Sequence, residues 1–255
     1  MQLEQIKAVV TGGASGLGFA VAKRLVGHGA QVALLDVNDE KGQAAAAELG
    51  ASARFFRADV TSEDGIAATV QQAQQAMGGL NAAINCAGIL GAGRVLGKEG
   101  AMPLKTFAGT VMVNLVGSFN VAKAAAALMQ HNAPGEDGER GAIVNTASIA
   151  AFEGQIGQAA YSASKGGVVG MTLPMAREFA RIGVRVMTIA PGVFHTPMVD
   201  GMPEQVYQSL CAQVPYPSRL GKPEEFADTV AFILQNRYLN GGVIRIDGAI
   251  RMQPK

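Results

Sequence analysis

Short apolar runs alternate along the chain with longer amphipathic stretches that are rich in alanine. The short runs have the length and residue types of buried strands and lie at residues 6–10, 31–36, 53–59, 81–88, 141–148, 184–192 and 241–248. The longer stretches have helical periodicity and lie at residues 15–29, 39–50, 62–77, 106–130, 161–181 and 223–234. Such alternation predicts an α/β fold, a single doubly wound Rossmann-like domain over residues 1–255 with a seven-stranded parallel sheet flanked by helices on both faces.

Composition narrows the class of protein. Of the 255 residues, 49% are hydrophobic and 16% are charged, so a large core is available. The net charge of +1 without a long basic run argues against a nucleic-acid partner. No apolar run is expected to span a membrane, and the strand near the N-terminus leaves no room for a targeting peptide, which favours a cytoplasmic location. Cys86 and Cys211 lie far apart without metal-ligand spacing, so we expect reduced thiols and no metal site.

A glycine-rich turn follows the first predicted strand. Gly12, Gly16 and Gly18 form the spacing G-x-x-x-G-x-G where the strand ends and the next helix begins. Backbone N–H groups and the helix N-terminus at such a turn can hold a pyrophosphate, and glycine permits the close approach. Ser15 and Leu17 lie inside the turn and are expected to contact a dinucleotide. An ordinary glycine-rich turn is the alternative, which the position between strand and helix disfavours.

Asp36 ends the second predicted strand. An acidic residue at this position accepts hydrogen bonds from the ribose hydroxyls of NAD and repels the 2′-phosphate of NADP. No basic residue follows it directly, so the sequence predicts NAD as the cofactor. A helix-capping role is the alternative, for which Asn38 and Asp39 are better placed.

Two further strand ends are expected to contact the dinucleotide. Asp59 suits the adenine amino group, with Val60 beside the ring, although a helix cap formed by Asp59 and Thr61 fits the pattern almost as well. After the fourth strand, small residues let the backbone pass close to a ribose, and these are Cys86, Ala87 and Gly88.

Tyr161 and Lys165 are one helical turn apart, with Ser148 upstream. An ammonium beside a phenol lowers the pKa of the phenol from its ordinary value near 10, and a serine hydroxyl can hold a substrate oxygen within its reach. The three residues suit proton transfer at an alcohol or ketone oxygen. The alternative for the Tyr–Lys pair is an ordinary helix surface.

Taken together, TGGASGLG, NCAG, Asn114 in VNLVG, Ser148, YSASK and the PG of IAPG resemble the short-chain dehydrogenase/reductase superfamily over essentially the whole chain. The resemblance implies that Tyr161 is the general acid/base, that Lys165 lowers its pKa and binds the nicotinamide ribose, and that Ser148 holds the substrate oxygen. It also implies that Asn114 fixes a water on a proton path. Residues after the sixth strand would hold the nicotinamide end, and these are Pro191, Phe194 and Thr196.

Longer segments, among them AAFEGQIGQAAYSASKGG and NGGVIRIDGAIRMQP, are similar to the branch of type 2 3-hydroxyacyl-CoA dehydrogenases, also called type 10 17β-hydroxysteroid dehydrogenases. This similarity implies NAD-dependent oxidation of short or branched (3S)-3-hydroxyacyl-CoA in fatty-acid or isoleucine degradation, and a homotetramer. We expect a bacterial counterpart. Two alternatives stay open: an alcohol, hydroxysteroid or 3-oxoacyl-carrier-protein oxidoreductase of the same superfamily, and a noncatalytic NAD-binding interaction subunit.

The substrate side is less defined by the sequence. Gln155 and Gln158 lie between the serine and the tyrosine, near enough to touch a thioester, or at a polar loop edge. Residues 194–217 suggest a lid, with an apolar helix at 199–213 and with Met198, Met202 and Tyr207 facing an acyl chain or packing in the core. The insertion at residues 91–103 is a long surface loop, and His195 replaces an expected small residue near the pocket mouth. Three basic residues in or beside this loop could meet CoA phosphates or simply be solvated, and these are Arg94, Lys98 and Lys105.

Overall fold

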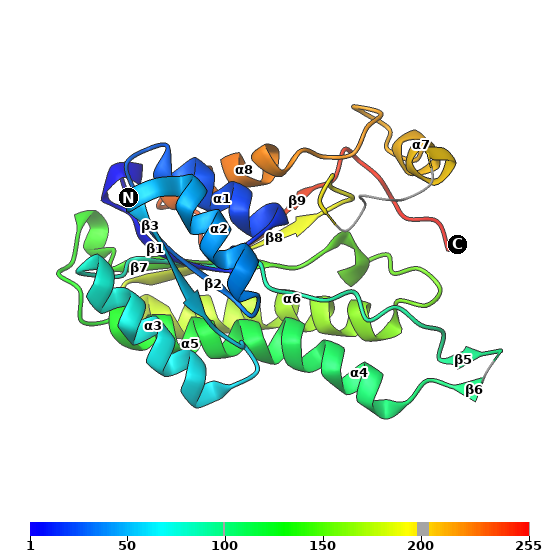
Figure 1. The fold of residues 1–255 in the computed structure, drawn as a ribbon, viewed down its shortest axis with the longest axis horizontal. Coiled ribbons are helices and arrows are strands. Elements are labelled where there is room, and N and C mark those ends of the chain that lie inside the picture. Colours follow the sequence, from blue (N-terminus) through cyan, green and yellow to red (C-terminus); the bar gives the residue numbers. More distant parts are fainter. Residues whose placement is uncertain (99, 198–203, 255) are drawn as a thin grey trace.

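The fold is described by a computed structural model, which covers residues 1–98, 100–197 and 204–254 (Figure 1). Seven parallel strands form one sheet in the order β3-β2-β1-β4-β7-β8-β9. The strands are β1 (Lys7–Thr11), β2 (Gln31–Asp36), β3 (Ala53–Arg57), β4 (Ala82–Asn85), β7 (Gly141–Thr146), β8 (Val184–Pro191) and β9 (Val243–Ile246). The sheet confirms the predicted α/β, doubly wound fold.

Helices cover both faces of the sheet (Figure 1). They are α1 (Gly16–Val26), α2 (Asp39–Leu49), α3 (Glu63–Met77), α4 (Leu104–Val111), α5 (Gly117–Met129), α6 (Ala159–Phe179), α7 (Glu204–Ala212) and α8 (Pro223–Gln235). Apolar side chains of α1 and α8 pack with one face of the sheet in one core cluster. Those of α3, α5 and α6 pack with the other face in a second cluster. Burial on both faces explains why the central strands are almost wholly apolar.

The end of the third strand differs from the prediction. β3 stops at Arg57, two residues before Asp59. The Asp59 carboxylate accepts from both the N–H and the hydroxyl of Thr61, at 2.9 and 2.7 Å, which closes a tight turn. Ser62, rather than the Asp59–Thr61 pair, accepts from Gly65 N–H and caps α3. Asn38 caps α2, as the sequence indicated, and leaves Asp36 available for another role.

The stretch predicted as one helix at 106–130 consists of α4, a π-helical segment at Met112–Val116 and α5. Contrary to the expectation, Leu104–Met129 is long and apolar enough to cross a membrane by length and composition, the single such run among the described residues. Half of its most apolar window is buried inside the protein, against α3 and α6, as in a core helix. Its composition is therefore accounted for by packing within the fold.

The two expected surface features lie beside the carboxyl edge of the sheet. In the 91–103 insertion, β5 (Leu96–Gly97) pairs antiparallel with β6 (Gly100–Ala101) near the start of α4 (Figure 1). In the predicted lid, α7 replaces the expected helix at 199–213, and Tyr207 on α7 packs near Cys211 and Leu220. Met198 and Met202 lie outside the described residues.

Candidate active site

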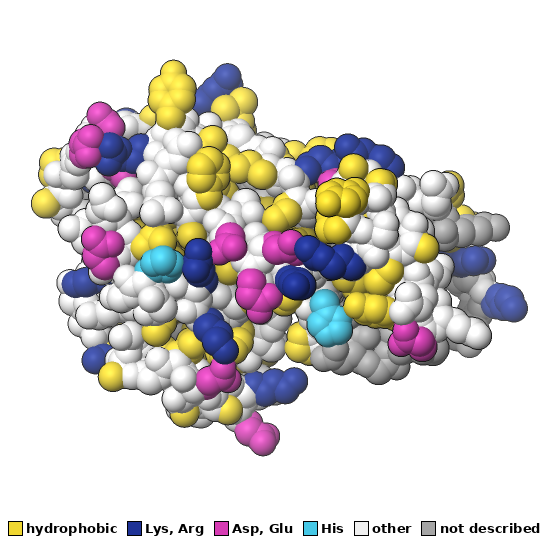
Figure 2. All heavy atoms as spheres, turned by 90° about the horizontal axis from the view of Figure 1, so that it is seen from above, with side chains coloured by type: hydrophobic (Ala, Val, Ile, Leu, Met, Phe, Trp, Pro, Cys, Tyr) yellow, Lys and Arg dark blue, Asp and Glu magenta, His cyan; other side chains and the backbone are white. Residues whose placement is uncertain are grey.

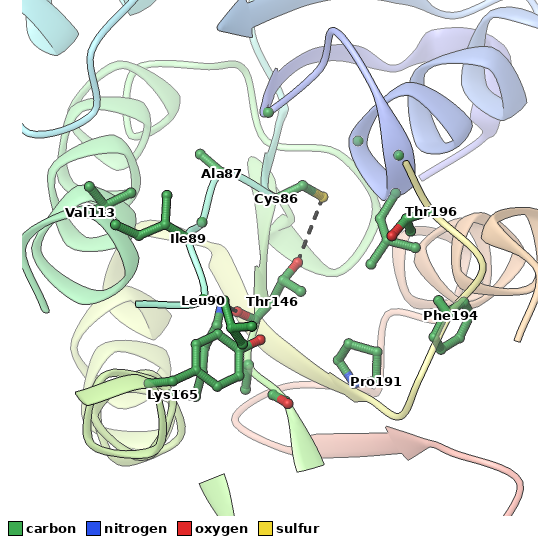
Figure 3. Close-up of a pocket in the computed structure, with 18 of the residues that line it drawn as sticks. Cys86, Ala87, Ile89, Leu90, Val113, Thr146, Lys165, Pro191, Phe194 and Thr196 are labelled. Atoms are coloured by element: carbon green, nitrogen blue, oxygen red, sulfur yellow. Dashed lines mark hydrogen bonds between the residues drawn. The ribbon is translucent and has the colours of Figure 1, made fainter. Parts of the chain in front are cut away.

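A cavity of about 800 Å³ opens at the carboxyl ends of the strands, where ligands bind in open parallel sheets. Figure 3 shows Ile89 and Val113 on one side of it and Phe194 and Thr196 on the other. We call the part of the cavity beside the glycine turn the cofactor half, and the part beside Ser148 and Tyr161 the substrate half.

At two positions the glycine turn packs too closely against neighbouring backbone to admit a larger residue. Gly12 has a φ of 61°, and a Cβ there would lie 2.9 Å from Ala87 N. A Cβ on Gly18 would lie 2.3 Å from the carbonyl oxygen of Gly12. The hydroxyl of Thr11 accepts from the N–H groups of Cys86 and Ala87, both at 3.1 Å, and so joins the ends of β1 and β4. This narrow backbone cradle fits the phosphates of a dinucleotide.

Asp36 faces this cradle from the end of β2. One carboxylate oxygen accepts from Ala14 N–H at 3.3 Å, and the other accepts from Asn38 N–H at 3.1 Å. Asp36 lines the cavity with its side chain half-buried. An ionised carboxylate held here suits ribose hydroxyls and opposes a 2′-phosphate.

Lys165 is buried beneath the substrate half of the cavity. Its ammonium donates to the carbonyl oxygen of Thr146 at 2.8 Å and lies 5.7 Å from the centroid of the Tyr161 ring. Burial lowers the pKa of Lys165 to about 8, partly opposed by the nearby Cys86. Burial also raises the pKa of the Cys86 thiol to about 11, so this thiol is protonated at neutral pH.

The pKa of Tyr161 shifts opposite to the expected direction, while the lowering effect of Lys165 on it stays a prediction. Burial raises the pKa of the Tyr161 phenol, while hydrogen bonding with Ser148 acts in the opposite direction. Desolvation of the charged form therefore outweighs the favourable neighbours. The sequence places the ammonium near the phenol but does not show how deeply both groups are buried.

Asn114 lies in the π-helical segment and is fully buried. Its side chain accepts from Ile89 N–H at 2.8 Å and donates to Ile89 O at 2.9 Å. It also donates to the hydroxyl of Ser164 at 3.0 Å, next to Lys165. The side chain thus holds the loop after β4 against α6. Its expected role in fixing a water stays a prediction.

The segment after β8 forms the wall opposite Ile89. Phe194 pairs with Gly221 in a short parallel bridge, and His195 N–H donates to Gly221 O at 2.8 Å. Arg219 and Glu225 form a two-pronged ion pair, at 2.9 and 2.7 Å, which fixes the loop carrying Gly221. This pair, with a backbone hydrogen bond from Lys222, lowers the pKa of Glu225 to about 2.

Most of the predicted site residues line this one cavity. They are Gly12, Ser15, Gly16, Leu17, Gly18, Asp36, Asp59, Val60, Cys86, Ala87, Gly88, Ser148, Gln158, Tyr161, Lys165, Pro191, Phe194 and Thr196. Their roles toward cofactor and substrate stay predictions. Asn114 lies behind the wall, and Gln155 is not in the lining, because its amide donates to the carbonyl of Gln253 at 3.0 Å.

The sequence analysis missed several lining residues. Ile89 and Leu90 follow the predicted strand at 81–88, and Thr146 lies within the predicted strand at 141–148, so all three could have been found from their place at strand ends. Met252 comes from the C-terminal tail and carries no motif. The basic residues Arg94, Lys98 and Lys105 are exposed and do not line the cavity.

Two further observations concern the class of ligand that the protein could bind. Within the described ranges, no group of three or more His, Cys, Asp or Glu residues could hold a metal ion. On the face drawn in Figure 2, basic and acidic side chains are interspersed rather than gathered by sign. His195 is exposed between the lining residues Phe194 and Thr196, with its ring 6.0 Å from that of Tyr207, edge to face.

Comparison with known proteins agrees with this geometry. The family model for short chain dehydrogenase matches residues 7–206. The chain is 55% identical to human 3-hydroxyacyl-CoA dehydrogenase type-2 over 249 residues, which is 97% of this chain and 95% of that protein. It is 51% identical to the protein of the same name from Drosophila melanogaster, with 97% and 98% coverage. The crystal structure of 3-hydroxyacyl-CoA dehydrogenase type-2 from Mycobacterium avium superposes with a TM-score of 0.95 at 45% identity, covering 100% of this chain and 99% of that chain.

Proposed function

Because this chain belongs to the short-chain dehydrogenase/reductase family and is an oxidoreductase, we propose that it oxidises short or branched (3S)-3-hydroxyacyl-CoA to 3-oxoacyl-CoA with NAD as the cofactor. Fatty-acid or isoleucine degradation is the pathway that we infer. The observation that carries the proposal is the similarity to enzymes with this name along 97% of the chain. It is supported by the proximity of Ser148, Tyr161 and Lys165 in one cavity.

Family membership implies a nicotinamide cofactor, and the cavity fits one. The cradle at Gly12 and Gly18 would receive the pyrophosphate, and the carboxylate of Asp36 would receive the ribose hydroxyls. Phe194 and Thr196 would hold the nicotinamide end. The preference for NAD over NADP rests on Asp36.

The chemistry of the chain's own residues is proton transfer. When bound, the cofactor supplies the hydride acceptor. Ser148 would hold the substrate hydroxyl, and the Tyr161 phenolate would accept its proton. Since burial raises the Tyr161 pKa, the phenolate needs help, and the Lys165 ammonium near the ring can give it.

We also propose a homotetramer in the cytoplasm. Large apolar side chains stay exposed along α4, α5 and α6, including Leu104 at 78%, Phe119 at 44% and Leu173 at 44%. Exposed apolar faces of this kind are typical of subunit contacts. Light scattering after gel filtration tests the assembly, and a monomer at micromolar concentration would contradict it. Fractionation of the source cells tests the location.

The proposed activity is tested with the purified protein. Formation of NADH from NAD, or of NADPH from NADP, would be followed with 3-hydroxybutanoyl-CoA, a branched 3-hydroxyacyl-CoA, a hydroxysteroid and a simple secondary alcohol. We expect the highest kcat/KM for a hydroxyacyl-CoA with NAD. A higher value for a steroid or alcohol would overturn the thioester assignment, and a higher value with NADP would overturn the cofactor assignment.

A further inference from the structure

The C-terminal tail turns back from the sheet toward the cavity. After β9, Gly248 and Ala249 adopt φ values of 58° and 66°. The Asp247 carboxylate accepts from Ala249 N–H at 2.9 Å, and Ile250 N–H donates to Asp247 O at 3.1 Å. A left-handed conformation at a residue with a Cβ costs about 1–2 kcal/mol, so contacts elsewhere must hold this reversal.

Charged side chains supply the first of these contacts. Arg245 donates to both oxygens of Glu153, at 2.8 and 3.1 Å, and lies 2.7 Å from Asp247. Arg251 of the tail pairs with the same two acids, at 3.2 and 3.1 Å. The carboxylate of Asp247 is only 10% exposed. The four charges therefore join β9, the tail and the segment that follows Ser148.

Apolar contacts hold the next part of the tail. Ile250 is buried against Ile149 and Val214, and Met252 packs on this cluster. Met252 also lines the cavity, and Ile149, on whose cluster it packs, directly follows Ser148 in the sequence. The thioether is thus part of the cavity wall and belongs to a tail that is fixed upstream.

The last described residues bind the segment between the serine and the tyrosine. Gln155 donates its side-chain amide to Gln253 O, and Ile156 N–H donates to Pro254 O, both at 3.0 Å. The Gln155 N–H in turn donates to the Gln158 side chain at 2.9 Å. Gln158 lines the cavity, so the tail positions a residue of the substrate half through two hydrogen bonds.

We propose that Met252, held in place by the contacts of its neighbours in the tail, forms a fixed wall of the substrate half and limits the length of the acyl group that the enzyme accepts. A flexible, apolar thioether suits contact with an acyl chain. The inference rests on the proposed function for the identity of the substrate. The position of Met252 in the wall is independent of that function, because it follows from the contacts that fix the tail.

The test compares Met252→Ala and Met252→Phe with the unaltered enzyme across straight-chain 3-hydroxyacyl-CoA thioesters from butanoyl to dodecanoyl. Met252→Ala is expected to raise kcat/KM for the longest accepted thioester about tenfold relative to the shortest, mainly through KM. Met252→Phe is expected to shift the preference toward the shortest. Gln253→Ala is the matched control, because it keeps the backbone carbonyl that accepts from Gln155.

An unchanged chain-length profile in both Met252 variants, with wild-type turnover of the series, would overturn the wall while leaving the proposed function intact. Wild-type turnover of secondary alcohols but of no thioester would overturn the proposed function. The same variants would then be compared on secondary alcohols of increasing length, where the same shifts support the wall and unchanged profiles overturn it. NADH binding is expected to stay within about twofold in every variant, since Met252 contacts the substrate half.

Discussion

Asp36 and Ala14 are joined by a hydrogen bond of 3.3 Å between a side-chain carboxylate and a backbone N–H, which ties the end of β2 to the glycine turn after β1. The bond keeps a negative charge at the rim of the cavity, beside the cradle of Gly12 and Gly18. A fixed charge at this position acts against any phosphate brought close to it.

Asp36→Asn removes that charge and keeps a side-chain oxygen as acceptor. We expect the ratio of kcat/KM for NADP to that for NAD to rise at least about tenfold, since like-charge repulsion is relieved. Steady-state kinetics with both cofactors measure the ratio. Asp39→Asn, a change of equal charge at the exposed start of α2, is expected to leave it unaltered. An unaltered ratio in Asp36→Asn would remove the basis for the NAD preference.

Lys165→Met should stabilise the fold at neutral pH. The folded pKa of about 8 lies below the ordinary 10.5, so the unfolded chain holds more protons between these values. The wild-type free energy of unfolding therefore rises as the pH increases through this window, by about 3 kcal/mol in all. Methionine removes this cost of the buried charge, and the lost hydrogen bond to Thr146 offsets part of the gain. The variant should therefore be about 1–2 kcal/mol more stable than the wild type at pH 7. Urea denaturation should show that the difference in free energy of unfolding between variant and wild type closes by pH 10. A difference that stays constant with pH would argue against a buried charge.

Tyr161→Phe should abolish turnover without loss of cofactor affinity. The substitution removes the group that accepts the proton, so kcat should fall by about 10²–10⁴-fold. A fluorescence titration should give an NADH dissociation constant within about threefold of the wild type, since the ring remains. Tyr238→Phe changes a fully exposed phenol and is the matched control. Appreciable turnover in Tyr161→Phe would identify another residue as the base.

The raised pKa of Tyr161 also sets the pH dependence of the wild type. Oxidation needs the phenolate, whose fraction grows about tenfold for each pH unit below the pKa. The kcat/KM for alcohol oxidation should therefore increase from pH 6 into the alkaline range. A pH–rate profile would measure this, and a rate that falls steadily with pH would be incompatible with proton acceptance by Tyr161.

Glu225→Gln should loosen the loop that carries Gly221. Because the folded pKa of about 2 lies below the ordinary 4.5, the stabilisation is present above 4.5 and is lost as the pH falls toward 2. Both side chains of the pair are more than a third exposed, so the loss should stay below about 1 kcal/mol at pH 7. Thermal unfolding should show a deficit in Tm of about 1–4 °C at pH 7 that shrinks at pH 3. Glu224→Gln, its exposed neighbour, should have no such effect.

The sheet and the cofactor half could be predicted because their signals are local. A strand buried on both faces is an apolar run, and a glycine turn after the first such run has few other uses. The end of β3 could not be placed, since the side chain of Asp59 decides it by binding Thr61. The position of the chain in its family came from motifs at strand ends, together with YSASK in α6 and VNLVG around the π-helical segment.

The substrate half could not be predicted to the same depth. Thr146 holds Lys165 through a backbone carbonyl, which every residue type possesses. Gln155 has the composition of a ligand-binding residue, yet it binds the tail, and only the three-dimensional fold brings residue 253 to it. The sign of the Tyr161 pKa shift depends on burial, which a spacing of four residues does not reveal.

The parallel direction of all seven strands has a practical consequence at the edge opposite the cavity. The connections that lead into the amino ends of the strands lie at this edge, far from the cavity. The exposed turn at residues 135–138 before β7 is one of these connections. Exposed turns of this kind tolerate inserted peptides. An epitope, a fluorophore attachment site or a tether to a solid support placed in this turn should leave the kinetics of the enzyme unchanged, which makes it the natural handle for immobilisation.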